Sequence, residues 1–398
     1  MWKFKRGIKR KKREIKHKSD INVIFFVRNR SQWKYNDLYD KLENNNKFNP
    51  QLVLSPEIGQ ENWKELLENT YNHFSKDYNV VYPYNNQTGW IDVTQEYNPD
   101  IIFYSKRNSS SDHPFSIMNY PHSLNCYVPY SIHADKNMKL QYDTIFYNLL
   151  WKYFVPTDFN KKFAKETARN NGRNVIVSGY PPCDRLIRHY QANKNSKSDK
   201  NGKKITIIWA PHHTISSGNH LSTFLSYYDF MIQLTKRYKD KMRIIFKPHP
   251  NLKNKLYELD SWGVERTDMY YKRWNEIRNG RLEEGEYITL FNESDAMIFD
   301  SVSFLSEYAC TGKPSLFLKR REDIFEENMN KLGKEVAKSA YKGSTKEEIT
   351  EFIDEVVLSG NDYLLCERRK VMNEVLSPPN NKSATENIYN HLRLEINK

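Results

Sequence analysis

The sequence predicts an α/β protein built from two Rossmann-like, doubly wound domains that face a cleft. Two observations lead to this prediction. Short runs that are apolar at every position alternate with polar, helix-length stretches, which is typical of parallel strands covered on both faces. In addition, 398 residues exceed what one hydrophobic core usually organises. We therefore expect two domains, each with its own sheet.

The apolar runs fall into two series. The first comprises residues 21–27, 51–55, 79–83, 100–105 and 174–181, and the second comprises 204–211, 242–250, 287–291, 296–300 and 314–318. The polar segment 189–204 between them has no apolar periodicity and is the expected linker. The predicted divisions are therefore 1–19, 20–190, 203–378 and 379–398. In the last of these, Ile388, Leu392 and Ile396 recur every four residues, which predicts an amphipathic helix that packs on either domain.

Residues 1–19 hold ten lysine or arginine residues and one acid, within a chain of net charge +13. Such a block favours an anionic membrane surface or a nucleic acid, and the alternative is a solvated, disordered tail. Trp2, Phe4 and Ile8 would add a shallow apolar anchor. Because no zinc-finger spacing and no aromatic RNP motif follows, we expect no nucleic-acid partner. The segment therefore predicts contact with an anionic membrane.

Other classes of protein are excluded by the sequence pattern. The basic block is not followed by the apolar core of a secretory signal, and no run approaches the ~20 apolar residues that span a bilayer. The four cysteines are far apart and form no CxxC pair, which favours a reduced, cytosolic protein. Aromatic residues make up 14% of the chain, so its apolar surface is concentrated in large rings and favours a folded state.

Polar residues gather where strands of the second series end. Pro211, His212 and His213 end one strand, Lys247 and His249 another, and Asp300 a third. Because ligands bind at the carboxyl ends of parallel strands, these residues predict one binding site. The prolines on both sides of His249 predict a rigid turn that presents its imidazole.

Ser301 and Ser303 follow Asp300 and precede the helical pattern that contains Glu307. The free N–H groups of a helix N-terminus, with serine hydroxyls beside them, favour an anion such as phosphate. The alternative is that Ser303 is only an N-cap. With Lys247 and His249 opposite this helix, the site would neutralise a diphosphate.

Cofactors and metals are not predicted. The sequence contains no GxGxxG, no P-loop and no DxD pair. His212 and His213 are adjacent and His220 follows, but adjacent ring nitrogens seldom converge on one metal, so no metal is assigned. His133 follows an apolar run and would act as a general base if it faced the cleft, or else is an ordinary loop histidine.

The order of motifs resembles the CDP-glycerol glycerophosphotransferases of teichoic acid and capsule synthesis. The matching segments are "SIHADKNMK", "FVPTDF", "VSGYPPCDRL", "IIWAPHH", "IIFKPHP" and "DAMIFDSVSFLSEYACTGKPSLFL", within roughly residues 120–320. Residue by residue, the resemblance includes His133, Gly179–Pro181 with Asp184, His249–Pro250, Asp300 with Ser303, and Glu307 with Gly312–Pro314. Ile132 and Ala134 replace the tryptophan and glycine that flank the family's first histidine, Cys183 replaces an asparagine, and Phe299, Ser301 and Val302 depart from the motif around Asp300.

The resemblance implies two Rossmann-like domains in the GT-B arrangement, with the acceptor on the side of residues 20–190 and the nucleotide donor in residues 203–378. It implies transfer of a polyol phosphate from a CDP-activated donor to a hydroxyl of a glycan or lipid-linked acceptor. His133 and His249 would be catalytic, and Lys247, Pro211, His212, Asp300, Ser301, Ser303 and Glu307 would bind the donor. With this charge present, a divalent ion is not required. The implied location is the cytoplasmic, inner face of the bacterial cell membrane, where cell-envelope polymers begin.

Two other functions fit the same residues. A GT-B glycosyltransferase with a nucleotide sugar donor would use the strand-end serines and Glu307 in the same way. A non-catalytic binder of anionic glycopolymer or nucleic acid would depend on the charge of +13 alone. Transfer of phosphate distinguishes the first function from the second, and nucleotide turnover distinguishes both from the third.

Overall fold

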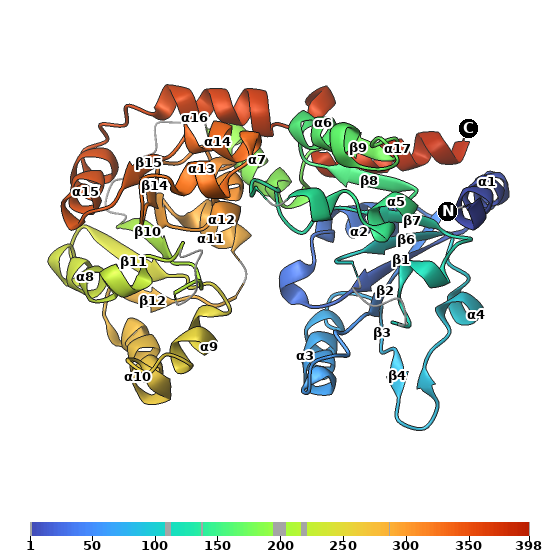
Figure 1. Cartoon of the computed structure of the whole chain (residues 1–398), viewed down its shortest axis with the longest axis horizontal. Helices are drawn as coiled ribbons and strands as arrows, with labels where there is room; N and C mark the ends of the chain where they lie inside the picture. The colour runs from blue at the N-terminus through green and yellow to red at the C-terminus, as the bar shows by residue number, and fades with distance from the viewer. Residues whose placement is uncertain are drawn as a thin grey trace. The chain divides into compact units, whose positions relative to one another are not determined.

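The structure is a computed structural model that describes residues 2–107, 113–136, 138–193, 204–215, 221–285 and 287–397. Its contacts divide the chain into two compact units. Unit 1 comprises residues 1–132, 137–184 and 378–398, and unit 2 comprises residues 133–136 and 185–377. In Figure 1 each unit is a β-sheet with helices packed against it. The two predicted α/β domains with parallel sheets are thereby confirmed.

Unit 1 contains a seven-stranded parallel sheet in the order β3-β2-β1-β6-β7-β8-β9. Its strands are β1 (Ile21–Val27), β2 (Phe48–Leu54), β3 (Val80–Val81), β6 (Ile101–Tyr104), β7 (Leu124–Tyr127), β8 (Lys152–Val155) and β9 (Val175–Val177). Strands β7 and β8 were not expected from the sequence. Each has only four residues, and a polar residue stands second in β7 (Asn125) and first in β8 (Lys152). The described core of this unit is rich in aromatic rings, most of them in tilted or edge-to-face contact, and Phe25 stacks on Phe103 at 5.1 Å between centroids.

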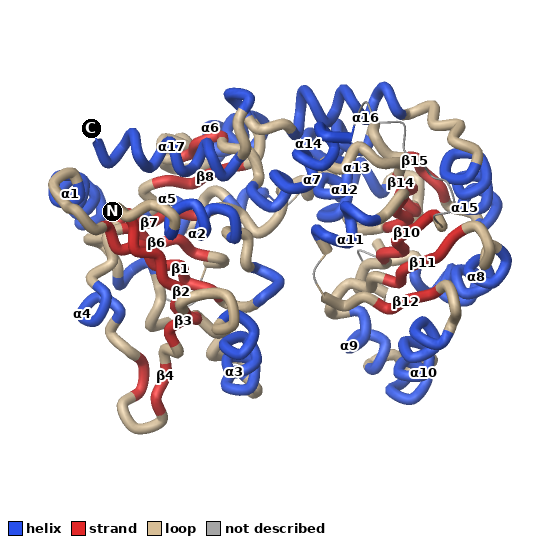
Figure 2. Tube along the Cα trace, turned by 180° about the vertical axis from the view of Figure 1, so that it is seen from behind, coloured by secondary structure: helices blue, strands red, loops and turns tan. Residues whose placement is uncertain are grey.

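The helices of unit 1 are α1 (Trp2–Ile15), α2 (Asn36–Glu43), α3 (Trp63–Phe74), α4 (Val93–Tyr97), α5 (Ile145–Leu149), α6 (Asp158–Thr167) and α17 (Ala384–Asn397). Helix α7 (Pro181–Asn193) carries the chain from unit 1 into unit 2. The predicted linker 189–204 therefore begins inside a helix, and its residues 194–203 lie outside the described part. Strands β4 (Tyr84–Asn85) and β5 (Gly89–Trp90) form an antiparallel hairpin that extends away from the sheet in Figure 2.

Unit 2 contains a six-stranded parallel sheet in the order β12-β11-β10-β13-β14-β15. Its strands are β10 (Ile205–Ala210), β11 (Met242–Phe246), β12 (Gly280–Leu282), β13 (Ala296–Phe299), β14 (Ser315–Leu318) and β15 (Tyr341–Gly343). Its helices are α8 (Phe224–Arg237), α9 (Leu252–Tyr257), α10 (Gly263–Glu276), α11 (Ile288–Glu293), α12 (Val302–Ala309), α13 (Ile324–Asn328), α14 (Lys331–Ala337), α15 (Lys346–Glu351) and α16 (Leu365–Val371), with a π-helical segment at Phe352–Leu358.

The strand predicted over residues 287–291 is wrong. This apolar run forms helix α11, which buries Leu290 and Phe291. A five-residue apolar run fits a strand or one buried helical turn equally well, and its neighbours decide between them. Here the Lys313 ammonium donates to the carbonyls of Asn292 and Ser294 at the end of the helix, at 2.6 and 2.5 Å. A cation at a helix C-terminus satisfies carbonyls that have no partner within the helix.

Residues 2–15 form a helix rather than a disordered tail. One stripe of α1 is buried and contains Phe4, Gly7, Lys11 and Ile15. Gly7 is required there, because a Cβ atom would lie 1.8 Å from the carbonyl oxygen of Pro121. The opposite face carries exposed basic residues.

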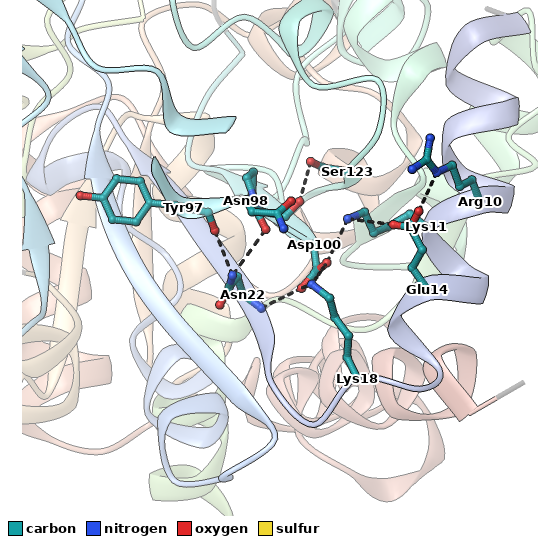
Figure 3. Close-up of polar contacts among 10 residues, drawn as sticks. Arg10, Lys11, Glu14, Lys18, Asn22, Tyr97, Asn98, Asp100 and Ser123 are labelled. Atoms are coloured by element: carbon teal, nitrogen blue, oxygen red, sulfur yellow. Dashed lines mark hydrogen bonds and ion pairs between the residues drawn. The ribbon is translucent and has the colours of Figure 1, made fainter. Parts of the chain in front are cut away.

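A buried carboxylate fixes the basic segment to the sheet, as Figure 3 shows. The Asp100 carboxylate accepts from the Lys11 ammonium at 3.0 Å and from the Lys18 ammonium at 2.7 Å. It also accepts the backbone N–H of Asn22 at 3.0 Å. Because Asp100 is fully buried, removal of either cation would leave part of its charge uncompensated.

The predicted C-terminal helix is present as α17, and Ile388, Leu392 and Ile396 are all buried. It packs in unit 1 beside α2 and α1. Its first turn is capped by Asp184, whose carboxylate oxygens accept the backbone N–H groups of Ala384 and Thr385 at 2.7 and 2.8 Å. The last residues of the chain therefore complete the fold of the first unit.

Candidate functional site

The topology of unit 2 defines one edge at which a ligand is expected. From β10 the chain adds β11 and β12 on one side, and then returns to add β13 on the other. The carboxyl ends of β10 and β13 therefore flank a topological switch point. In open α/β sheets, ligands bind outside the strand ends at such a point.

Three imidazoles meet at this switch point. His212 and His213 follow β10, and His249 follows β11. The ring centroids of His213 lie 4.2 Å from His212 and 4.0 Å from His249, and the rings of His212 and His249 are 5.1 Å apart. All three side chains are partly exposed. The expectation that strand-end residues converge therefore holds for His212, His213 and His249.

Backbone hydrogen bonds fix the strand end that carries His249. The backbone N–H of Lys247 donates to the carbonyl of Trp209 at 2.8 Å, which continues the β10–β11 pairing beyond the strand. The next N–H in register belongs to His249 and donates to the carbonyl of Pro211 at 3.0 Å. The turn is therefore held by its backbone, and Pro211 contributes a carbonyl oxygen to it. Lys247 itself is buried, close enough to His249 to lower the pKa of its imidazole.

The Asp300 carboxylate holds the backbone on which His212 stands. Its Oδ1 accepts the backbone N–H of His212 at 2.6 Å, and its Oδ2 accepts both the N–H and the hydroxyl of Thr223 at 2.6 and 2.8 Å. The side chain is fully buried, and burial raises the pKa of its carboxyl group to about 6 despite these donors. Asp300 thus holds the loop after β10 and the residue that precedes α8, and any effect on a ligand passes through His212.

Burial lowers the pKa values of the clustered imidazoles. For His212 the pKa falls to about 3, with further lowering by His213 and His249. For His249 it also falls to about 3, with further lowering by His213 and Lys247. Burial, and then Lys255, lowers the pKa of His213. In the absence of an anion, these rings are neutral at pH 7.

Backbone contacts select the tautomer of His249. The N–H of Asn251 donates to Nδ1 of His249 at 3.1 Å, so a neutral ring carries its proton on Nε2. At His212, Nδ1 lies 3.0 Å from the hydroxyl of Thr214 and 3.4 Å from its backbone N–H, and the direction of the hydroxyl contact sets the tautomer. His113 in unit 1 has the same geometry as His249: its Nδ1 accepts from Phe115, and its Nε2 lies 2.8 Å from the carbonyl of Pro56. The cluster therefore presents the Nε2–H donor of His249.

A metal ion is the other ligand that three histidines suggest. Contrary to the sequence argument, the ring nitrogens of His212, His213 and His249 do converge, and all lie within 4.8 Å of one another. A metal ligand needs a lone pair, however, and Nε2 of His249 would have to lose its proton to provide one while Nδ1 is occupied. N–H donors suit anionic oxygens better. His220 lies outside the described residues.

Helix α12 begins beside the cluster with two serines in different roles. Ser301 is the N-cap, and its hydroxyl accepts the N–H of Phe304 at 3.4 Å. Ser303 lies in the first turn and is exposed. The sequence left open that Ser303 is only the N-cap of this helix. The N-cap is Ser301 instead. Glu307 is buried on the same helix.

His133 is held by unit 2 rather than by the first sheet. The Asn330 side-chain amide donates to the carbonyls of His133 and Asp135, both at 2.9 Å. The N–H of Asn330 donates to the carbonyl of Ala134 at 3.0 Å. The imidazole is buried, and burial lowers its pKa to about 4. The sequence placed His133 in the first domain, whereas residues 133–136 group with unit 2.

Several other motif residues support the backbone. Gly179 has φ +88°, and a Cβ atom there would lie 2.6 Å from Cβ of Pro378. Gly312 has φ +68°, and a Cβ atom would lie 2.5 Å from the ring of Tyr190. Asp184 caps α17, and Lys313 caps α11, as described above. Sequence reasoning also missed Thr223, whose position before the apolar pattern of α8 is typical of a helix-preceding threonine.

Solved structures share this architecture. The wall teichoic acid polymerase TagF is 12% identical with a TM-score of 0.59, and the match covers 99% of this chain and 97% of that one. UDP-GlcNAc 2-epimerase from Neisseria meningitidis is 15% identical with a TM-score of 0.54, covering 94% and 100%. S. aureus MnaA, solved with UDP, is 17% identical with a TM-score of 0.54, covering 96% and 97%. At these identities the likeness shows the GT-B fold alone.

A family model is more specific than the fold. No curated protein sequence matches the chain significantly. Residues 129–394, however, match the model of the CDP-glycerol:poly(glycerophosphate) glycerophosphotransferases. The chain therefore belongs to this family and is a transferase of polyol phosphate. The family implies a CDP-glycerol-type donor and a glycopolymer acceptor.

Proposed function

We propose that the switch point of unit 2 binds the diphosphate of a CDP-activated polyol. The observation that carries this proposal is the convergence of three neutral imidazoles beside the buried cation Lys247. The Nε2–H group of His249 would donate to a diphosphate oxygen, His212 would bind beside it, and Lys247 would offset the charge of the diphosphate. Ser303 and the free N–H groups of α12 would contact the same group.

The reaction is an in-line transfer at the β-phosphorus. An acceptor hydroxyl forms a new P–O bond, the P–O bond to CMP breaks, and CMP leaves with the bridging oxygen. The hydroxyl proton passes to a base, for which we propose His133. Phosphoryl transfer depends mostly on positioning and charge stabilisation, which the imidazole cluster and Lys247 would supply to the leaving phosphate.

His133 can act as the general base only if the environment of its ring changes when substrates bind. Its ring is buried, so it must become accessible when the substrates bind. A pKa of about 4 is low for a general base, which works best near the ambient pH. A bound diphosphate nearby would raise this pKa, because an anion stabilises the imidazolium.

The chemical test is incubation with CDP-glycerol, CDP-ribitol and a panel of nucleotide sugars, with mass measurement of both products. We expect release of CMP and a mass gain that includes phosphate. Release of a nucleoside diphosphate with transfer of an unphosphorylated sugar would instead establish a glycosyltransferase. Salt-sensitive polymer binding without any nucleotide turnover would establish a non-catalytic binder.

We further propose that α1 holds the enzyme on the inner face of the cell membrane, where a lipid-linked acceptor of a teichoic acid or capsular polymer is extended. Lys5, Arg6 and Lys9 are exposed on the outer face of this helix. The predicted apolar anchor is reduced, because Phe4 is buried, whereas Trp2 remains 73% exposed. Among the described residues, no helix is both long and apolar enough to cross a bilayer.

Substitution tests this surface better than deletion does, because removal of residues 1–19 would also remove the buried contacts of Phe4, Lys11 and Ile15. A triple change of Lys5, Arg6 and Lys9 to glutamine should weaken binding to anionic vesicles by roughly 3 kcal/mol, at about 1 kcal/mol per basic residue. Turnover on a soluble acceptor should not change. The matched control is the same change at Lys161, Lys162 and Lys165, on α6. Equal sedimentation of both variants with the vesicles would remove the proposed role of α1.

A further inference from the structure

His213 has no role in the proposed donor site so far, although it is the nearest neighbour of both other imidazoles. Its ring centroid lies 4.2 Å from that of His212 and 4.0 Å from that of His249, whereas these two rings are 5.1 Å apart. Its side chain is partly exposed. An anion that contacts the ring of His249 therefore lies beside the ring of His213 as well.

The other two rings have contacts that oppose a second proton. Nδ1 of His249 accepts the backbone N–H of Asn251 at 3.1 Å, so a proton on this nitrogen would break the contact. Nδ1 of His212 lies 3.0 Å from the hydroxyl of Thr214 and 3.4 Å from its backbone N–H, which a proton there would face. Both rings therefore favour the neutral state, with one ring nitrogen protonated.

The ring of His213 differs from its neighbours in this respect. Its Nδ1 is buried and has no hydrogen-bond partner among the residues that the structure describes. A second proton on this ring therefore breaks no hydrogen bond at Nδ1. His213 is thus the ring of the cluster that becomes an imidazolium most readily when an anion is supplied.

The positive groups around His213 keep it neutral in the free protein. Burial, and then Lys255 on α9, lowers the pKa of its imidazole, and the Lys255 ammonium is itself paired with Glu258 at 2.6 Å. Burial, then His213, and then Lys247 lower the pKa of the His249 imidazole. A proton on His213 would therefore meet cations on α9 and after β11.

The carboxylate of Asp300 is directed at the backbone and not at these rings. It accepts the N–H groups of His212 and Thr223, both at 2.6 Å. A bound diphosphate would bring negative charge to the side chains themselves. Since an anion stabilises the charged form of an imidazole, donor binding and protonation would favour one another.

We propose that His213 is a further donor-binding residue, which takes up a proton from solvent when the diphosphate binds and holds it as an imidazolium. This inference rests on the proposed binding of the donor at the switch point of unit 2. It adds a charge-assisted contact to the diphosphate and couples donor affinity to pH.

Unit 1 offers a contrast. Its sheet has a switch point between β1 and β6, because the chain adds β2 and β3 beside β1 before it returns to add β6. The residue that follows β1 there is Arg28, and a guanidinium stays charged throughout the neutral pH range. Proton uptake is therefore expected of the switch point in unit 2, where the strand ends carry imidazoles.

The test is calorimetric titration of the full chain with CDP-glycerol at pH 7, in buffers that differ in their enthalpy of ionisation. The diphosphate of this donor is esterified at both ends, so the ligand itself exchanges no proton near pH 7. The slope of the observed enthalpy against the buffer enthalpy gives the number of protons taken up. We expect roughly one proton in the wild type, with affinity rising by up to about 10-fold for each unit that the pH falls.

Two variants of His213 separate its charge from its structural role. His213→Asn should bind CDP-glycerol about 10-fold more weakly at pH 7, the effect of one lost charge-assisted contact, and should take up no proton. His213→Arg carries a permanent charge, so it should recover affinity without proton uptake. His122→Asn, an exposed change in unit 1, is the matched control and should behave as the wild type does.

The outcomes that overturn the inference are distinct from those that overturn the donor site. Binding of CDP-glycerol to the wild type without proton uptake would overturn this inference and leave the donor site intact. Uptake that persists in His213→Asn would assign the proton to another group, such as His133. An equal loss of uptake in His122→Asn would show that it does not depend on the cluster. Absence of CDP-glycerol binding would contradict the donor site, and this inference with it.

Discussion

The two units hold the residues at their strand ends in the same way, but these residues differ in chemistry. In unit 1 the residue after β6, Ser105, accepts the backbone N–H of Arg28, just beyond β1. In unit 2 the residue after β13, Asp300, accepts the backbone N–H of His212, just beyond β10. Each switch point is therefore closed by a side chain of one strand end that holds the backbone of the other.

In each unit a third strand, β2 or β11, carries a polar residue three positions after its end. Glu57 stands three residues after β2 and pairs with Arg28. His249 stands three residues after β11, with its ring 5.1 Å from that of His212. One end thus offers permanent cations, and the other offers neutral N–H donors beside a buried lysine. We infer that the scaffold fixes where ligands bind, whereas the strand-end side chains decide which anion binds and how strongly salt affects it.

The largest expected effect is on turnover. His249→Ala and His133→Ala should each lower it by at least ~100-fold, the usual scale for a general base or a donor to developing charge. His122→Ala, an exposed change in unit 1, should have no effect. Steady-state release of CMP measures all three, with circular dichroism to show that each variant folds. Near-normal rates in both site variants would remove the mechanism.

The protonation of the imidazole cluster gives unit 2 a pH-dependent stability. A histidine with a lowered pKa in the folded state stabilises the fold above its unfolded value of ~6.5, and this stabilisation is lost as the pH falls toward about 3. Between pH 7 and pH 5 each such ring should cost up to about 2 kcal/mol. Asp300 acts in the opposite sense, because its raised pKa favours the folded state at low pH, and this contribution is lost as the pH rises through about 6.

Urea unfolding at pH 7 and pH 5 isolates the contribution of His249. The His249→Asn variant should lose less stability on acidification than the wild type, by up to about 2 kcal/mol. Both the wild type and the variant retain Asp300, so its contribution to the pH dependence of stability cancels in the comparison. An identical loss in the two proteins would mean that His249 already titrates in its ordinary range.

Substitution of Asp300 and of Ser105 tests whether the two switch points act independently. Asp300→Asn replaces one acceptor oxygen with a donor and should displace His212, so CDP affinity should fall by about 10-fold. Ser105→Ala removes the equivalent acceptor in unit 1 and should leave CDP affinity unchanged. CDP affinity is measured by calorimetry on each variant. A fall in CDP affinity in Ser105→Ala would contradict the assignment of the donor to unit 2.

The smallest effect separates the two serines of α12. Ser303→Ala should weaken CDP binding by roughly 3-fold, as expected for one hydroxyl hydrogen bond, and leave stability unchanged. Ser301→Ala should instead cost about 1 kcal/mol of stability through loss of the N-cap. Thermal unfolding and CDP titration of both variants distinguish these roles. Unchanged CDP affinity in Ser303→Ala would leave this hydroxyl outside the donor site.

The sequence by itself determined the fold class and the strand ends at which chemistry gathers. Runs such as residues 21–27 and 242–246 are apolar at all but one position, because a parallel strand covered on both faces needs this pattern, and it can be recognised from the sequence of the run alone. For the same reason His212, His249 and Asp300 could be assigned to one edge of one sheet. The amphipathic repeat of Ile388, Leu392 and Ile396 likewise predicted α17.

The tertiary structure decided what local pattern leaves open. Residues 287–291 became a helix because burial and the Lys313 cap favour that state over an equally compatible strand. The basic segment became a packed helix because Asp100, far away in sequence, accepts Lys11 and Lys18. Whether a polar side chain faces a ligand or the backbone depends on partners that the chain brings from a distance, as it does for the Asp300 carboxylate on His212 and Thr223. For that reason only the folded chain separates residues that would bind the donor from those that hold them in place.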